Sequence, residues 1–146
     1  MNNQNLAGTI ENLRLAAQVF IEGNFNSIII NTRNAISNNL TEWDDPSSPK
    51  RRRILRREIK DACLSHVPIR DKDDYNEILN YAGNIAASLS GIVNKYTHEN
   101  QNIIRLRPLH ADLELLYYSV SLVTKYLTTL TIPDYDSQTY TETSPL

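Results

Sequence analysis

The sequence lacks the features of a disulfide-bonded, membrane-spanning or secreted protein. Cys63 is the only cysteine, so there is no intrachain disulfide, no CxxC pair and no cysteine cluster for a metal. No segment approaches the roughly 18 apolar residues of a transmembrane helix. The first residues, Met1 to Asn5, do not have the basic and then apolar regions of a signal peptide. We therefore expect a soluble protein of the reducing cytoplasm, with no membrane contact.

Familiar catalytic and cofactor motifs are also missing. The chain has no Gly-rich phosphate loop, no HExxH, no set of metal ligands and no Ser-His-Asp order, and we expect neither a metal nor a cofactor. The formal net charge is −2, which gives the whole molecule no attraction for nucleic acid. Any such affinity must come from a local patch of charge.

Apolar residues at helical spacing are present along most of the 146 residues. This pattern predicts an all-α antiparallel bundle of about five helices, over residues 6–22, 25–43, 50–65, 75–96 and 109–130. The Ile28-Ile29-Ile30 triplet is β-branched and is also compatible with a strand, but the periodicity continues beyond it and favours a helix. Residues 1–131 are expected to form one domain. The polar segment 132–146 has no apolar repeat and is expected to be an exposed or disordered arm.

Two apolar stripes dominate the second half of the chain. Because both step by three or four residues, each is expected to be the core face of a long helix. The stripes are Tyr75, Ile78, Ala82, Ile85, Leu89, Ile92 and Tyr96, and then Leu109, Leu113, Leu116, Val120, Val123, Leu127 and Leu130. A polar segment, residues 95–102, lies between them and is the expected place for a chemical site.

His98 is the first candidate residue. It follows the first stripe by less than one turn and has Asn94 and Lys95 close by. An imidazole can exchange a proton near neutral pH, and the neighbouring groups could hold a phosphodiester for cleavage. The alternative is a helix C-terminus stabilised by an imidazole and a lysine near its dipole.

Arg105 and His110 form a second candidate, in which the arginine binds phosphate and the histidine transfers a proton. Pro108 separates them, and His110 falls in the first turn of the last predicted helix. With Asp112 and Glu114 following, the alternative is an exposed first turn whose acids suit the helix dipole.

A basic run is the third candidate. A helix that starts after Ser48 and Pro49 would carry a patch able to hold a nucleic-acid backbone without recognising its sequence. No aromatic residue interleaves with the charges, so the pattern does not predict stacking on unpaired bases. The alternative is a solvated face that pairs with nearby acids. The run consists of Lys50, Arg51, Arg52, Arg53, Arg56, Arg57 and Lys60.

The layout resembles the HEPN superfamily over roughly residues 5–130. The resemblance rests on a paired-helix start with Gly23-Asn24-Phe25 and Arg33, a long helix ending in a polar turn with His98, and a final apolar helix. It implies an all-α bundle of a prokaryotic toxin–antitoxin, abortive-infection or other anti-phage system. Many members are metal-independent ribonucleases with an Arg, four to six residues and a His, and they usually act as homodimers, some with an antitoxin or another defence protein.

Transferred to this chain, the resemblance assigns the family histidine to His98 and the polar residue after the arginine to Asn94. The arginine position falls at Val93, with Lys95 as a substitute charge. Arg105 and His110 have the family spacing, but Leu106 occupies the polar position. The resemblance therefore implies an RNA-directed protein, an endoribonuclease of weakened or lost activity. The alternative is a non-catalytic adaptor or small subunit that binds RNA or an acidic protein through residues 50–60.

Overall fold

The computed structural model describes residues 4–22, 25–98, 103–104 and 106–132, and this part of the chain is mostly helical. Its α-helices are α1 (Gln4–Glu22), α2 (Phe25–Arg33), α3 (Arg57–Leu64), α4 (Lys72–Tyr96) and α5 (His110–Leu130). A π-helical segment, η1 (Asn34–Leu40), continues α2, and a 3₁₀ turn, η2 (Ile69–Asp71), precedes α4. The strands are β1 (Thr41–Trp43), β2 (Arg53–Leu55), β3 (Thr97–His98) and β4 (Ile103–Ile104).

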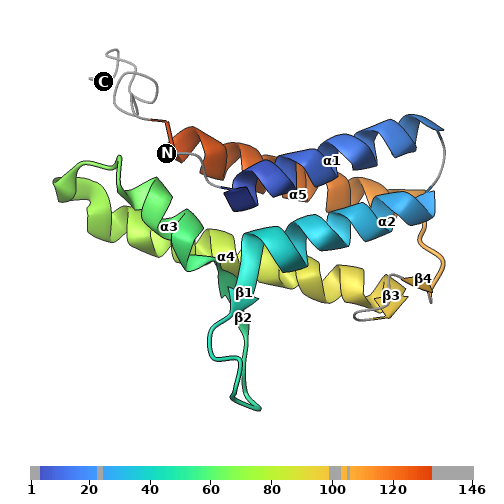
Figure 1. The fold of residues 1–146 in the computed structure, drawn as a ribbon, viewed down its shortest axis with the longest axis horizontal. Coiled ribbons are helices and arrows are strands. Elements are labelled where there is room, and N and C mark those ends of the chain that lie inside the picture. The colour runs from blue at the N-terminus through green and yellow to red at the C-terminus, as the bar shows by residue number, and fades with distance from the viewer. Residues whose placement is uncertain (1–3, 23–24, 99–102, 105, 133–146) are drawn as a thin grey trace.

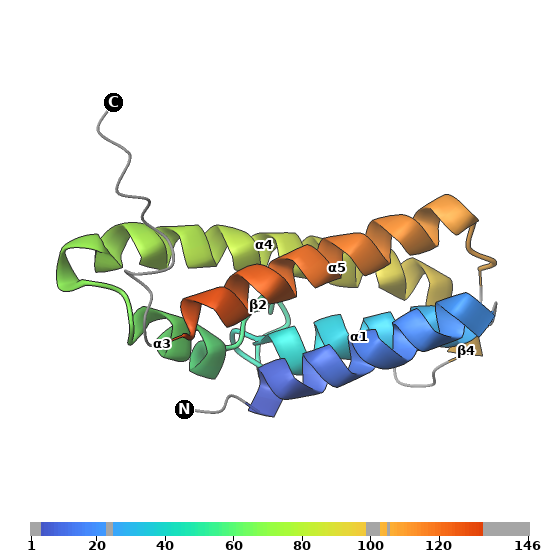
Figure 2. The ribbon, with the colours of Figure 1, turned by 90° about the horizontal axis from the view of Figure 1, so that it is seen from above.

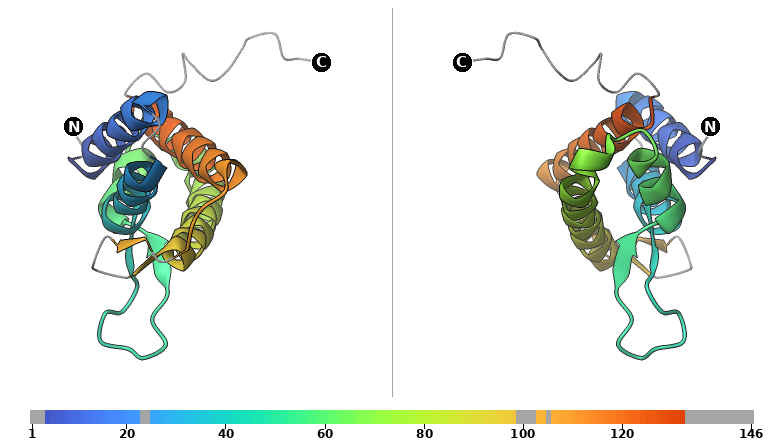
Figure 3. Two further views of the ribbon diagram at one scale, coloured as in Figure 1. Left: turned by 90° about the vertical axis from the view of Figure 1, so that its right-hand side faces the viewer. Right: turned by 90° about the vertical axis from the view of Figure 1, so that its left-hand side faces the viewer.

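Four helical rods, namely α1, α2 with η1, α4 and α5, surround one core (Figure 1). The helix α1 packs antiparallel to the rod formed by α2 and η1, and α4 packs antiparallel to α5 (Figure 2). Viewed along the bundle, the two pairs enclose the core between them, while α3 closes one end (Figure 3). None of the helices within the described residues is long and apolar enough to cross a membrane.

The core is built by aliphatic side chains from every rod. The helical assignment of the isoleucine triplet is confirmed, because Ile28 and Ile29 lie in α2 and are fully buried. The second predicted stripe is confirmed for most of its length on α5. Buried residues from the other rods and from α3 belong to the same core cluster, including Leu6, Ile36, Leu40, Ile59, Leu79, Leu89 and Val93.

The prediction of an all-α fold is wrong in two regions, of which residues 41–55 are the larger. The helix expected over 25–43 ends at Leu40, and the helix expected over 50–65 begins only at Arg57. Between them β1 and β2 form an antiparallel hairpin with Trp43 opposite Arg53 and Thr41 opposite Leu55. A second two-stranded ladder, β3–β4, replaces part of the polar segment expected after α4.

Hydrogen bonds made by side chains of residues 42–48 explain why this region forms a hairpin and not a helix. The carboxylate of Asp44 accepts hydrogen bonds from the Arg52 N–H at 3.0 Å and the Asp45 N–H at 2.7 Å, which closes the loop between the strands. Ser48 accepts from the Lys50 N–H and so stabilises a turn rather than a helix start. Glu42 accepts from the Arg57 N–H at 2.6 Å, so the N-terminus of α3 is capped from β1.

The predicted core face of α4 is rotated from the observed one. Ile78 and Ile85 are 41% and 52% exposed, whereas Leu79, Ala86 and Val93 are buried. The cause is that α4 packs against two neighbours, the core on one side and β2 on the other, so its small residues turn inward and part of its apolar stripe turns outward. Periodicity alone could not anticipate the second neighbour, because the hairpin itself was missed.

Two expectations fall outside the described residues. These are the Gly23-Asn24 junction between the first two predicted helices and nearly all of the C-terminal arm, residues 133–146.

Gly83 allows the hairpin to approach α4. A Cβ atom at this position would lie 2.9 Å from the backbone nitrogen of Leu55 and 3.0 Å from its Cβ, closer than real contacts allow. Gly83 itself is buried in the middle of α4. The absence of a side chain at this residue therefore sets the distance between β2 and the helix.

Gly83→Ala should lower the free energy of unfolding by about 1–2 kcal/mol, because overpacking against backbone outweighs the gain in helix propensity of about 1 kcal/mol. Gly91→Ala is the matched control in the same helix. A Cβ at Gly91 meets nothing within 4 Å, so this change should stabilise by about 0.5–1 kcal/mol. Urea unfolding followed by circular dichroism measures both. If both variants changed the free energy of unfolding in the same direction, the close approach of Leu55 to Gly83 would be contradicted.

Candidate nucleic-acid interface

The β1–β2 hairpin projects from the side of the bundle (Figures 1 and 3). Residues 41–60, which contain it, carry seven Lys or Arg and four Asp or Glu, while the whole chain has a formal net charge of −2. Nearly half of the chain's 15 basic residues therefore lie in this one segment. A local patch of positive charge, which nucleic-acid binding by this chain would need, is therefore present, and it lies on the hairpin and the first turn of α3.

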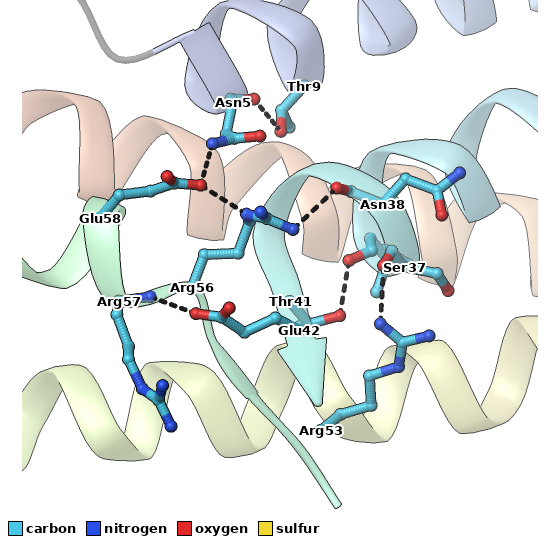
Figure 4. Close-up of polar contacts among 11 residues, drawn as sticks. Asn5, Thr9, Ser37, Asn38, Thr41, Glu42, Arg53, Arg56, Arg57 and Glu58 are labelled. Atoms are coloured by element: carbon cyan, nitrogen blue, oxygen red, sulfur yellow. Dashed lines mark hydrogen bonds and ion pairs between the residues drawn. The ribbon is translucent and has the colours of Figure 1, made fainter. Parts of the chain in front are cut away.

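Two arginines fix the base of the hairpin to the end of η1 (Figure 4). Arg53 Nη1 donates to the Ser37 carbonyl at 2.8 Å, and Arg56 Nη1 donates to the Asn38 carbonyl at 3.4 Å. These carbonyls belong to the last turn of a helix, where backbone acceptors lack helical partners and positive charge is favourable. Glu58 holds Arg56 from the other side and also accepts from Asn5 of α1. Arg56 is therefore a structural residue.

Trp43 interleaves with the basic residues in space, although not in sequence. The guanidinium carbons of Arg51 and Arg53 lie 4.5 Å and 4.1 Å from the centre of its ring. Contacts of this type contribute about 0.5–1 kcal/mol at exposed sites. The basic run thus has an aromatic neighbour that its own sequence does not contain, because the ladder places Trp43 directly opposite Arg53.

Two adjoining hollows lie where the hairpin meets α4, and together they are called the basic groove here. The two share Arg52 and Asn84, so they form neighbouring parts of one surface. The first has a volume of about 420 Å³ and is lined by Trp43, Arg52, Arg53, Asn84, Ala87, Ser88, Ser90, Gly91 and Asn94. The second has a volume of about 360 Å³ and is lined by Asp44, Arg52, Ile54, Leu55, Arg57, Lys60, Asn80 and Asn84.

The helical wall of the basic groove is small and polar. Asn80, Asn84, Gly91 and Asn94 line it from successive turns of α4. At 1.5 Å per residue, the row from Asn80 to Asn94 is about 21 Å long. Small residues let a backbone come close, and the amides can donate and accept hydrogen bonds. A basic wall thus faces a neutral polar wall, an arrangement suited to a chain of phosphates.

Asn94 joins two candidate sites that the sequence placed far apart. It belongs to the motif ending at His98, and it also lines the hollow formed with the basic hairpin. Its Oδ1 atom is buried and accepts no hydrogen bond from the described residues. One turn earlier, the Ser90 hydroxyl bonds the Ser37 hydroxyl at 3.0 Å, which ties this part of α4 to η1.

The structure describes only some of the other candidate residues in full. His98 is in β3, paired with Ile103, but its side chain lies outside the described part of the molecule, as does the whole of Arg105. Lys95 is exposed near the end of α4. His110 lies in the first turn of α5, as expected, with its Nε2 2.8 Å from Glu114 Oε1. His110 is not among the residues that line the basic groove.

Two buried polar side chains of the bundle do not line the basic groove. Arg33 is only 6% exposed at the end of α2, one turn before Ser37. Cys63 is fully buried, and its thiol donates to the Leu127 carbonyl at 3.5 Å. Burial raises the pKa of the Cys63 thiol to about 12, so this group stays protonated and is a poor nucleophile at neutral pH.

The residues that sequence reasoning missed are Trp43, Asn80, Asn84, Ser88 and Gly91. A signal for the first was present, since Trp43 is followed by an Asp-, Pro- and Ser-rich turn and then by Arg53-Ile54-Leu55. Two short β-compatible segments around such a turn are typical of a hairpin. The α4 residues had no signal of their own, because small polar residues on one side of a helix are common on solvent-exposed faces.

Comparison with known proteins finds no matching family model, no matching curated protein and no matching solved structure. Among the side chains that the structure describes, no three His, Cys, Asp or Glu residues gather where they could hold a metal ion. The interface must therefore be interpreted from its own geometry.

Proposed function

We propose that this chain is a HEPN-like protein that binds RNA in the basic groove and holds it without cutting it. The observation that carries the proposal is the convergence of the basic hairpin and the Asn94 end of α4 on one surface. The family resemblance adds the biological setting, a prokaryotic anti-phage defence or toxin–antitoxin module. Within that setting the chain acts as an adaptor or small subunit.

The charges of the groove favour a phosphate chain. Arg52 and Arg57 are exposed, and both contact Asp44, a residue at the hairpin's own turn. A guanidinium binds phosphate oxygens through two parallel hydrogen bonds, which makes arginine the common residue for such contacts. The surface ion pair of Arg52 with Asp44 is weak enough to exchange for a phosphate.

Binding without cleavage is supported by Val93, the residue at the family arginine position. Its side chain is fully buried in the core, whereas Asn94, the next residue, lines the groove. The buried face of α4 therefore supplies a valine where the resemblance requires a phosphate-binding group.

Exposed apolar residues support a homodimer. Leu122 is 68% exposed, and other large apolar side chains of the paired helices α4 and α5 are also exposed. A monomer rarely leaves so many on neighbouring helices without a partner. The remaining residues of this apolar face are Ile78, Tyr81, Ile85, Leu115, Tyr118 and Tyr126.

The first prediction concerns charge. Wild-type protein should bind a fluorescent RNA with an affinity that falls steeply with salt. The double variant Arg52→Gln/Arg57→Gln should bind more weakly, with a slope of log K against log salt that is smaller by about 1.4, since each single-strand phosphate contact contributes about 0.7. Fluorescence anisotropy over a salt series measures both quantities.

The matched control is Arg14→Gln/Arg70→Gln, which removes the same charge from exposed ion pairs with Glu11 and Asp71 away from the hairpin. It should bind like wild type. Equal losses in both double variants would show that the groove has no special role. Binding to poly-glutamate but not to RNA would indicate an acidic protein partner instead.

Cleavage is a second candidate function, favoured by Asn94, which lines the groove one turn before His98. The test is incubation of total RNA with the protein in EDTA, beside His98→Ala and His110→Ala variants. Our proposal predicts intact RNA throughout. RNA lost with wild type but not with His98→Ala would establish a metal-independent nuclease. Loss that only His110→Ala abolishes would move the site to Arg105 and His110.

The dimer has its own test. Leu122→Glu should convert a wild-type dimer to a monomer, because the change buries a charge in the proposed interface. Ala7→Glu, on the exposed side of α1, is the control and should leave the dimer intact. Size-exclusion chromatography with light scattering measures the mass. A monomeric wild type at tens of micromolar would contradict a homodimer through this face.

A further inference from the structure

Trp43 stands where the hairpin meets α4 and lines the 420 Å³ hollow of the basic groove. The ring is partly exposed, so one portion of it is accessible from this hollow. It is also the only tryptophan in the chain. An aromatic ring beside a row of arginines is the usual combination on surfaces that hold unpaired nucleic acid, where bases stack and phosphates pair with charge.

The size and the walls of the hollow suit a flat group. A volume of about 420 Å³ is within the range of small-ligand sites. Ala87 and Gly91 line the helical side, and a Cβ atom at Gly91 would meet nothing within 4 Å. A planar group can therefore enter beside the indole without displacing protein atoms from the α4 wall.

Asn84 and Asn94 give the same hollow hydrogen-bonding capacity. Each amide has both a donor and an acceptor group, which matches the edges of nucleobases. The Asn94 oxygen accepts no hydrogen bond from the described residues, and a base amino group is one donor that could satisfy it after a small rotation of the amide. The lining is therefore aromatic on one side and amide-bearing on another.

We propose that the basic groove is specific for single-stranded RNA, with one unpaired base stacked on Trp43 inside this hollow. The inference rests on the proposed RNA binding and narrows it to a substrate class. Inside a duplex both faces of each base are covered by neighbouring pairs, so only the two end pairs have a face that could meet the indole. A single strand can turn one base inward while its flanking phosphates contact Arg52.

Arg51 contacts the Trp43 ring but does not line the hollow. Its guanidinium lies over the ring, but no described hydrogen bond of its side chain holds it there. Arg53, by contrast, is anchored to the Ser37 carbonyl. When RNA binds, the base stacks on the indole from the hollow, and Arg51 turns to a flanking phosphate. The ion–ring contact in the free protein thus keeps Trp43 in position for stacking.

The test compares a 12-nucleotide single strand with a duplex of the same sequence, using wild type, Trp43→Phe and Trp43→Leu. Trp43→Leu should weaken single-strand binding by about fivefold to 150-fold, the range that one base stack contributes. Trp43→Phe keeps an aromatic ring and should retain most of the affinity. Duplex binding, already weaker, should not change between the three proteins. Fluorescence anisotropy of the labelled RNA gives the affinities.

Trp43 emission in wild type provides a measurement that needs no variant. The single strand should quench it and the duplex should not. Equal salt-dependent binding of both RNAs, with no quenching and no effect of Trp43→Leu, would overturn the stacking proposal but leave RNA binding in the groove intact. No binding of either RNA would overturn both. If Trp43→Leu loses binding because it does not fold, quenching of the wild-type Trp43 emission by the single strand would still support stacking.

Discussion

The close approach of Leu55 to Gly83 is the constraint on which the proposed interface depends. With no side chain at Gly83, β2 lies against α4, and the hairpin leaves the bundle beside the helix instead of away from it. The basic groove is the space that results, bounded by β1 and β2 on one side and by α4 on the other. A larger residue at this position would move the basic wall away from Asn84 and Asn94.

The basic run divides into residues that build the hairpin and residues that remain available to a ligand. Arg53 and Arg56 donate hydrogen bonds to carbonyls at the end of η1, where their positive charge also interacts favourably with the helix dipole. Arg52, Arg57 and Lys60 line the groove, while Lys50 and Arg51 lie at and beside the tip. One run of basic residues can therefore stabilise the hairpin and also provide charges for a ligand.

Helical periodicity was sufficient for most of the fold. It located α1, α2, α4 and α5 because their apolar repeats continue over several turns. It failed at residues 41–55, where charged side chains have weak preferences and tertiary contacts decide: Asp44 closes the turn, and Glu42 caps α3. The same error misplaced the buried face of α4, since a helix with two neighbours buries two faces. Ile78 and Ile85 became exposed as a result.

The candidate site was predictable in its parts but not in its assembly. Asn94 and the basic run were each identified from residue type and spacing. Their meeting on one surface depends on the pairing of Trp43 with Arg53, which brings residues 41 to 51 positions before Asn94 against the same helix. Contacts of that sequence separation are set by packing, not by local pattern.

The most direct test of the interface is an NMR titration of ¹⁵N-labelled protein with unlabelled single-stranded RNA. The account predicts that amide shifts concentrate in residues 41–60 and in the α4 segment 80–94, with the Trp43 indole signal among the most affected. Shifts confined to the exposed apolar face of α4 and α5, or centred on His110 and Glu114, would contradict it.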